Sequence, residues 1–163
     1  MRKDLTVLIK SLEYSFKDIE FLKKALLHSS AKLNGDDKNN SNERLEFLGD
    51  RVLSLVIAQI LLQMFPSENE GDLAKRHSAL VNKHTLFTVA ESLCIGDFIY
   101  MSEGEVSSGG RNNKKILSDC CEAIIAAIYL DGGLIEVSNF IKRHWISKIM
   151  GTQSPPKDYK TTL

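Results

Sequence analysis

The chain has 163 residues, of which 43% are hydrophobic and 26% charged, which fits one globular domain with a sizeable core. Its 21 Lys and Arg residues balance its 21 Asp and Glu residues, so net charge indicates neither a nucleic-acid nor a membrane partner. The longest apolar run, residues 52–65, is too short to cross a bilayer, and we expect no membrane association.

Helical periodicity dominates the chain and predicts an all-α fold. The expected helices cover, in chain order, residues 4–12, 18–28, 43–64, 72–93 with a break near Leu80, 114–130 and 134–150. The segments 34–42 and 102–113 are expected to be polar loops, and Asp131–Gly133 a helix C-cap. A few alternating residues around 97–101 are the only strand-like pattern, so no sheet is predicted.

The three cysteines, Cys94, Cys120 and Cys121, are odd in number and two are adjacent, which disfavours structural disulfides. Free thiols indicate a reducing compartment, and charged residues interrupt the N-terminus before a signal peptide could form. We therefore expect a cytoplasmic protein. Cys120 and Cys121 are expected to be buried packing residues, with an oxidation-sensitive role as the alternative.

Three carboxylates, Glu43, Glu46 and Asp50, stand at the head of the helix expected over residues 43–64. At about 100° per residue they share one face, which in an amphipathic helix is usually the solvent face. Further along, however, apolar residues occupy the same direction: Phe47, Leu53, Ile57, Ile60 and Leu61. A helix that is apolar on nearly all sides is expected in the centre of a domain, so these acids lie at the end of a buried element.

A second acidic pair, Asp119 and Glu122, stands on the helix expected over residues 114–130, which is also apolar in most directions. Burying an uncompensated carboxylate costs several kcal/mol, so four together need either a cation or shared protons. Oxygen ligands without a His or Cys at ligand spacing favour Mg²⁺ or Mn²⁺ over Zn²⁺. The two acidic segments therefore predict a shared divalent-metal site.

The segments that carry these acids resemble the two acidic motifs of ribonuclease III, the double-stranded-RNA endonuclease family. The matching segments, in chain order, are ALLHSS, NERLEFLGDRVL, FPSENEGDLAKRHSALVNKHTL, SSGGR and ILSDCCEAIIAAIYLDGG. The resemblance covers residues 11–145 and implies the helical fold of that family's endonuclease domain over residues 1–150. Residues 151–163 resemble a linker and the first residues of a double-stranded-RNA-binding domain.

The resemblance also implies roles for individual residues. It assigns the metal ligands to Glu46, Asp50, Asp119 and Glu122, with Asp50 and Glu122 as the essential catalytic pair. Mg²⁺ is the expected cofactor, and Mn²⁺ can substitute for it. Accessory roles in substrate handling or at the subunit interface fall to Glu43 and Glu70, although a helix N-terminus or a turn also explains an acid at either position.

The implied activity is metal-dependent hydrolysis of double-stranded RNA in rRNA and mRNA processing. The products carry 5′-phosphate and 3′-hydroxyl ends, and a homodimer with one site per subunit leaves short 3′ overhangs. Two alternatives remain open: a mini ribonuclease III that lacks the RNA-binding domain, and a non-catalytic ribonuclease-III-like RNA-binding protein.

Basic side chains are the expected contacts to RNA, because proteins recognise A-form helices mainly through phosphates and 2′-hydroxyls. The candidates lie after the EGD segment and before the second acidic motif: Lys75, Arg76, Arg111, Lys114 and Lys115. For any one of them, an ordinary solvated helix face is an equally good explanation.

Overall fold

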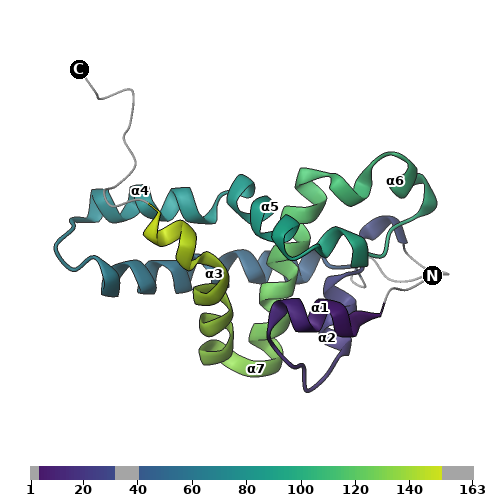
Figure 1. The fold of residues 1–163 in the computed structure, drawn as a ribbon, viewed down its shortest axis with the longest axis horizontal. Coiled ribbons are helices and arrows are strands. Elements are labelled where there is room, and N and C mark those ends of the chain that lie inside the picture. Colours follow the sequence, from purple (N-terminus) through teal and green to yellow (C-terminus); the bar gives the residue numbers. More distant parts are fainter. Residues whose placement is uncertain (1–3, 32–40, 152–163) are drawn as a thin grey trace.

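The computed structural model describes residues 4–31 and 41–151, and within these ranges the protein is helical without a β-strand. The helices are α1 Leu5–Leu12, α2 Glu20–Ala25, α3 Glu43–Met64, α4 Glu70–Val81, α5 Lys83–Ser92, α6 Glu103–Ser107 and α7 Lys114–Met150, with 3₁₀ turns at Ser29–Ala31, Ile95–Phe98 and Gly110–Asn112 (Figure 1). The predicted all-α fold is confirmed.

The helix α3 begins and ends at the predicted residues, but it is buried on one broad face only. Leu53, Ile57 and Leu61 are almost completely buried, whereas the Phe47 and Leu55 side chains are 63% and 59% exposed. The expectation of burial on nearly all sides was therefore wrong for α3. Large apolar side chains with this much exposed surface often mark a site of protein interaction.

The long helix α7 forms the centre of the domain. Residues 117–128 are all buried, and this half of α7 packs against α2, α3 and α5. The predicted end of this helix is a kink instead, at Gly133, where φ is 85°. Past the kink the second half of α7 turns back towards α4 (Figure 1), and the Trp145 indole donates a 2.8 Å hydrogen bond to the Leu80 carbonyl. The kink thus lets one helix close two sides of the core.

Two other helix boundaries differ from prediction, one because of a side-chain cap and one because of a backbone bridge. Residues 72–93 form two helices, because Asn82 ends α4 and its side chain accepts from the Thr85 amide to start α5. The predicted helix over residues 18–28 is shorter, since Leu27 leaves it to form an isolated bridge with Tyr100. Of the strand-like pattern at residues 97–101, only this bridge at Tyr100 forms, because Ile95–Phe98 is a 3₁₀ turn.

The two predicted loops have different outcomes. The segment 102–113 is not a loop throughout, because α6 and a 3₁₀ turn occupy most of it. Most of the loop predicted at 34–42, and the linker predicted at the C-terminus, lie outside the described residues. Within the described ranges, every helix is too short or too polar to span a lipid bilayer.

Candidate active site

A glycine sets the distance between the two acid-bearing helices. Gly49 lies in the interior of α3, and a Cβ at this position would overlap the carbonyl oxygen of Glu122 on α7. Glycine in a helix interior costs about 1 kcal/mol relative to alanine, so its presence indicates a packing or functional reason. Here the reason is the close approach of α3 to α7. This residue was missed in the sequence analysis, although an interior glycine was the signal for it.

Three of the predicted metal ligands converge from these helices. Glu46 from α3 and Asp119 and Glu122 from α7 each offer a carboxylate oxygen, and these oxygens lie within 4.8 Å of one another. Asp119 is 9% exposed and Glu122 is 8% exposed, while Glu46 is half-buried. An all-oxygen set of this kind suits a hard divalent cation.

The fourth predicted ligand, Asp50, lies at the edge of this group. It is exposed, pairs with Arg51 at 3.2 Å, and lies close enough to Glu122 for its negative charge to raise the pKa of that carboxyl. All four acids line one cleft of about 430 Å³ between the start of α3, the α4–α5 junction and α7. The structure thus brings together the four residues that the motifs predicted, with Asp50 on the solvent side.

The electrostatics of the cleft show how the acids are tolerated together. Burial, followed by the contact with Asp50, raises the pKa of Glu122 to about 9. Burial and the nearby Asp119 raise the pKa of Glu46 to about 7. Lys115 lies 2.6 Å from Asp119, whose hydrogen bond raises the pKa of that ammonium. Protons and one lysine therefore balance the acids, and a divalent cation could replace both, so the donor set fits a metal.

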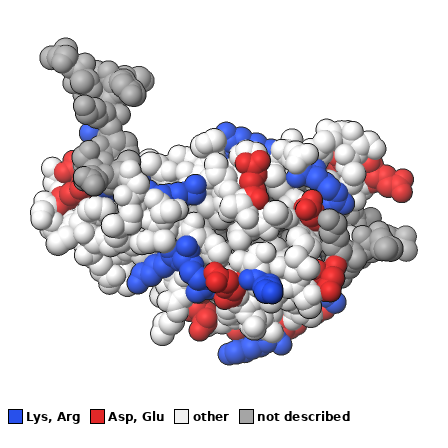
Figure 2. Space-filling model, in the orientation of Figure 1, with Lys and Arg blue, Asp and Glu red and all other residues white. Residues whose placement is uncertain are grey.

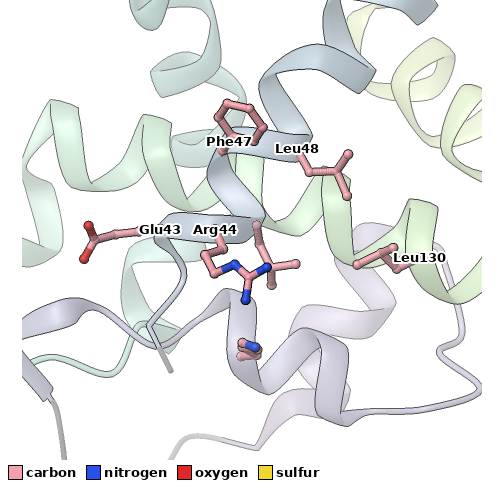
Figure 3. A pocket seen from close by; sticks show the side chains of 7 residues that line it. Glu43, Arg44, Phe47, Leu48 and Leu130 are labelled. Atoms are coloured by element: carbon pink, nitrogen blue, oxygen red, sulfur yellow. The ribbon is translucent and has the colours of Figure 1, made fainter. Parts of the chain in front are cut away.

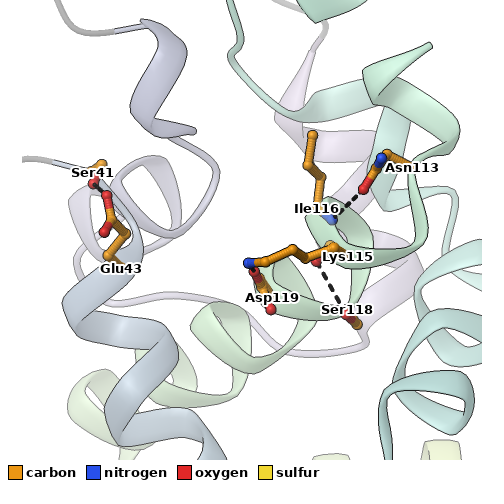
Figure 4. Close-up of polar contacts among 7 residues, drawn as sticks. All are labelled: Ser41, Glu43, Asn113, Lys115, Ile116, Ser118 and Asp119. Carbon is orange, nitrogen blue, oxygen red and sulfur yellow. Dashed lines mark hydrogen bonds and ion pairs between the residues drawn. The ribbon is translucent and has the colours of Figure 1, made fainter. Parts of the chain in front are cut away.

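The accessory acids lie in different places. Glu43 is exposed at the start of α3, accepts a hydrogen bond from Ser41, and lines the acid cleft across from the Lys115–Asp119 pair (Figure 4). Glu70 begins α4 and lines a separate, mainly apolar groove of about 840 Å³ between α3 and α4. Only Glu43 therefore stands beside the predicted metal ligands.

The head of α3 is fixed by Asn42, which the sequence analysis had placed in a loop. Asn42 is buried, and its side-chain amide donates to the Ala25 carbonyl while its backbone amide donates to Leu27. These two bonds attach the start of α3 to the end of α2. Glu46 follows one turn later, so Asn42 is a positioning residue, although the sequence analysis gave it no role.

The predicted RNA contacts divide into exposed and structural residues. Lys75, Lys114 and Lys115 are exposed. Arg76 is 3% exposed, and its guanidinium donates two 2.7 Å hydrogen bonds to Glu68, so its assignment as an RNA contact was wrong.

Arg111 is also engaged within the protein. Its Nη1 atom donates to the Gly96 and Ile99 carbonyls, which connects two turns. On the face shown in Figure 2, basic and acidic side chains are interspersed without a single basic stripe. Lys75, Lys114 and Lys115 therefore stay predicted phosphate contacts.

The cysteines behave as packing residues. All three are free, and Cys120 and Cys121 are buried, whereas Cys94 is exposed. Cys120 donates a 3.4 Å hydrogen bond to the Ala25 carbonyl, and burial raises the pKa of both buried thiols. A buried neutral thiol reacts slowly with oxidants, so the structure favours the packing interpretation.

The helical frame and the carboxylate cleft between α3 and α7 define a ribonuclease-III-like domain, and the Ribonuclease-III-like family model matches residues 18–149. Ribonuclease 3 of Ehrlichia ruminantium (strain Welgevonden) is 47% identical over 154 residues, which cover 94% of this chain and 67% of the relative. Ribonuclease 3 of Wolbachia pipientis subsp. Culex pipiens is 46% identical over 155 residues, with the same coverage of both chains. The chain belongs to the ribonuclease III family.

Solved structures agree with this assignment. A structure of the nuclease domain of ribonuclease III from Campylobacter jejuni, described for flexibility in a region involved in dimer formation, superimposes with a TM-score of 0.83 at 44% identity. It covers 91% of this chain and all of that chain. Dicer from Pichia stipitis is more distant, with a TM-score of 0.65 and 26% identity over 85% of this chain and 59% of its own.

Proposed function

We propose that this protein is a double-stranded-RNA endoribonuclease that uses Mg²⁺, or Mn²⁺ in its place, to hydrolyse phosphodiester bonds. The observation that carries the proposal is the meeting of Glu46, Asp50, Asp119 and Glu122 in one cleft. The products would carry 5′-phosphate and 3′-hydroxyl ends. The proposed setting is rRNA and mRNA processing in the cytoplasm.

Each acid has a distinct task in the proposed reaction. Glu46, Asp119 and Glu122 would hold the cation, which would supply Lewis acidity and make water a stronger nucleophile at neutral pH. Because the pKa of Glu122 is raised to about 9, Glu122 would have to lose its proton to ligate a cation, and metal binding would then release protons. Asp50 is exposed at the cleft rim, where an RNA phosphate arrives, and we assign it with Glu122 as the catalytic pair. No side-chain nucleophile is needed.

We infer a homodimer from apolar side chains that stay partly or largely exposed among the described residues. Phe47 and Leu48 of α3 and Leu130 of α7 border a pocket at the start of α3 (Figure 3). Leu55 and Leu62 of α3 line the separate groove that contains Glu70, and both are more than half exposed. Exposed apolar surface of this extent typically marks a protein interface. Two copies, each cutting one strand, would leave short 3′ overhangs.

Cleavage of a long RNA duplex, compared in Mg²⁺ and in EDTA, tests the proposed activity. We expect Mg²⁺-dependent cleavage that falls by about 10²-fold or more in Asp50→Asn and in Glu122→Gln, the range for removing a group that stabilises a transition state. Glu91→Gln, an equal change at an exposed site on α5, is the control. Near-normal cleavage by either cleft variant would contradict the assignment, and a wild-type protein that binds but never cuts would favour the non-catalytic alternative.

A further inference from the structure

One lysine already occupies a proposed metal ligand. The Lys115 Nζ atom lies 2.6 Å from Asp119 Oδ2, and Figure 4 shows the ammonium against this carboxylate. The Lys115 side chain is 70% exposed, whereas that of Asp119 is 13% exposed. A solvated, flexible side chain thus places its charge on an almost buried ligand.

The helix itself does not favour a lysine at this position. Asn113 caps α7 by accepting from the Ile116 amide, so Lys115 lies in the first turn. A cation there opposes the helix dipole, and a lysine that precedes its acid by four residues is the weaker order for such a pair. Glu43 and Glu46 on α3 also attract the ammonium. The surrounding acids, and not helix stability, account for Lys115.

We propose that Lys115 is a resident counter-cation of the metal centre, which leaves Asp119 when a divalent cation binds and thereby lowers the affinity for that cation. The inference rests on the proposed metal-dependent function. An ammonium bonded to Asp119 Oδ2 and a cation held by the same carboxylate repel each other, because both carry positive charge. Binding must therefore displace the lysine.

The structure provides room for the displaced side chain. A polar cavity of about 590 Å³ adjoins the acid cleft, and Lys115 lines it together with His28, Asn42 and Asn113. Glu46 and Asp119 line both spaces. The ammonium can move into this cavity by rotation of its own side chain while the backbone of α7 stays in place.

The other cation at the cleft differs in this respect. Arg51 pairs with Asp50, but its guanidinium also lies 4.0 Å from the centre of the Phe47 ring and donates to the Phe47 carbonyl. Asp50 is outside the three-oxygen group that lies within 4.8 Å. Arg51 is thus held on the rim, and Lys115 is the cation that competes for a ligand within that group.

Mn²⁺ binding without RNA, measured by calorimetry, tests the proposal independently of activity. Lys115→Met should bind Mn²⁺ about fivefold more tightly, equivalent to ~1 kcal/mol for loss of a partly exposed ion pair. Lys115→Arg, which retains the charge, should stay within about twofold of wild type. Lys114→Met removes an adjacent exposed charge that lines neither space, and it should change the affinity by less than about twofold.

Thermal unfolding supplies the second measurement. Without metal, Lys115→Met should melt at a lower temperature than wild type, since Asp119 loses its counter-charge; saturating Mn²⁺ should close this gap. Equal or weaker Mn²⁺ binding by a folded Lys115→Met would overturn the proposal, and Lys115→Gln serves as the second variant if the first fails to fold. A wild-type protein that binds no Mn²⁺ would overturn the proposed metal centre itself, together with this inference.

Discussion

Two regions of α3 break the ordinary rule of burial in opposite ways. At its start, Glu46 takes part in a cleft where Asp119 and Glu122 are nearly buried acids. On its outer face, Phe47 and Leu62 expose 63% and 65% of apolar side chains. Buried charge and exposed apolar surface both cost stability in an isolated domain, so each region indicates something that the single chain lacks. The first indicates a cation and the second indicates another protein surface.

The largest expected effect comes from separating the helices that form the cleft. Gly49→Ala inserts a Cβ into the Glu122 carbonyl, which should destabilise the fold by about 3 kcal/mol because backbone atoms must move. Urea unfolding measures this change. Gly71→Ala is the control, since a Cβ there meets only the Asn69 side chain at 3.4 Å. Equal stability of the two variants would refute the close-contact explanation.

A pH dependence follows from the two raised pKa values. In the folded protein the Glu122 pKa is about 9 and the Glu46 pKa about 7, against an ordinary value of 4.5. The folded state therefore binds these protons more tightly than the unfolded state, so stability is highest below pH 4.5 for these groups and declines towards pH 9. In EDTA we therefore expect stability to fall as the pH rises from about 4.5 through about 9.

Thermal melting between pH 5 and pH 9 measures this decline. Glu122→Gln should flatten the profile, because the amide cannot ionise, and saturating Mg²⁺ should restore stability at the alkaline end by neutralising the acids. If the metal-free wild type gained stability with rising pH over this window, the electrostatic account of the cleft would fail.

A smaller effect is expected on the apolar face. Leu62→Arg and Phe47→Ala should each weaken self-association by about tenfold, or ~1.4 kcal/mol, because a buried interface anchor is lost or charged. Sedimentation over a concentration series measures the dissociation constant. Val106→Ala trims an exposed apolar side chain on α6 and should leave it unchanged. A monomer at all concentrations would remove the argument for the dimer.

The smallest effect is expected beside the acids. Cys121→Val replaces a buried neutral thiol with a side chain of similar size, so stability should change by less than ~1.5 kcal/mol and Mg²⁺-dependent cleavage should persist. Peroxide treatment of wild type and variant provides the comparison. If peroxide inactivated only the wild type, the oxidation-sensitive role would be supported instead.

Local pattern predicted the helices well where the periodicity was long and strong, as in α3. It failed where a distant partner decided the ending: Leu27 leaves α2 because Tyr100 offers a backbone partner. It also could not tell that Arg76 turns inwards to Glu68, since a basic residue on a helix looks the same in sequence whether it is paired or solvated. Burial of a single charged residue depends on what lies opposite.

The sequence by itself determined that four acids occur in two helical segments and that these segments resemble the ribonuclease III motifs, because residue type and spacing are local properties. Only the tertiary structure decided how the acids divide. Gly49 lets α3 approach α7, three carboxylates then meet, Asp50 stays at the rim, and Lys115 reaches back to Asp119. The reason is physical: pKa values and ligand geometry depend on distances between segments that lie far apart along the chain.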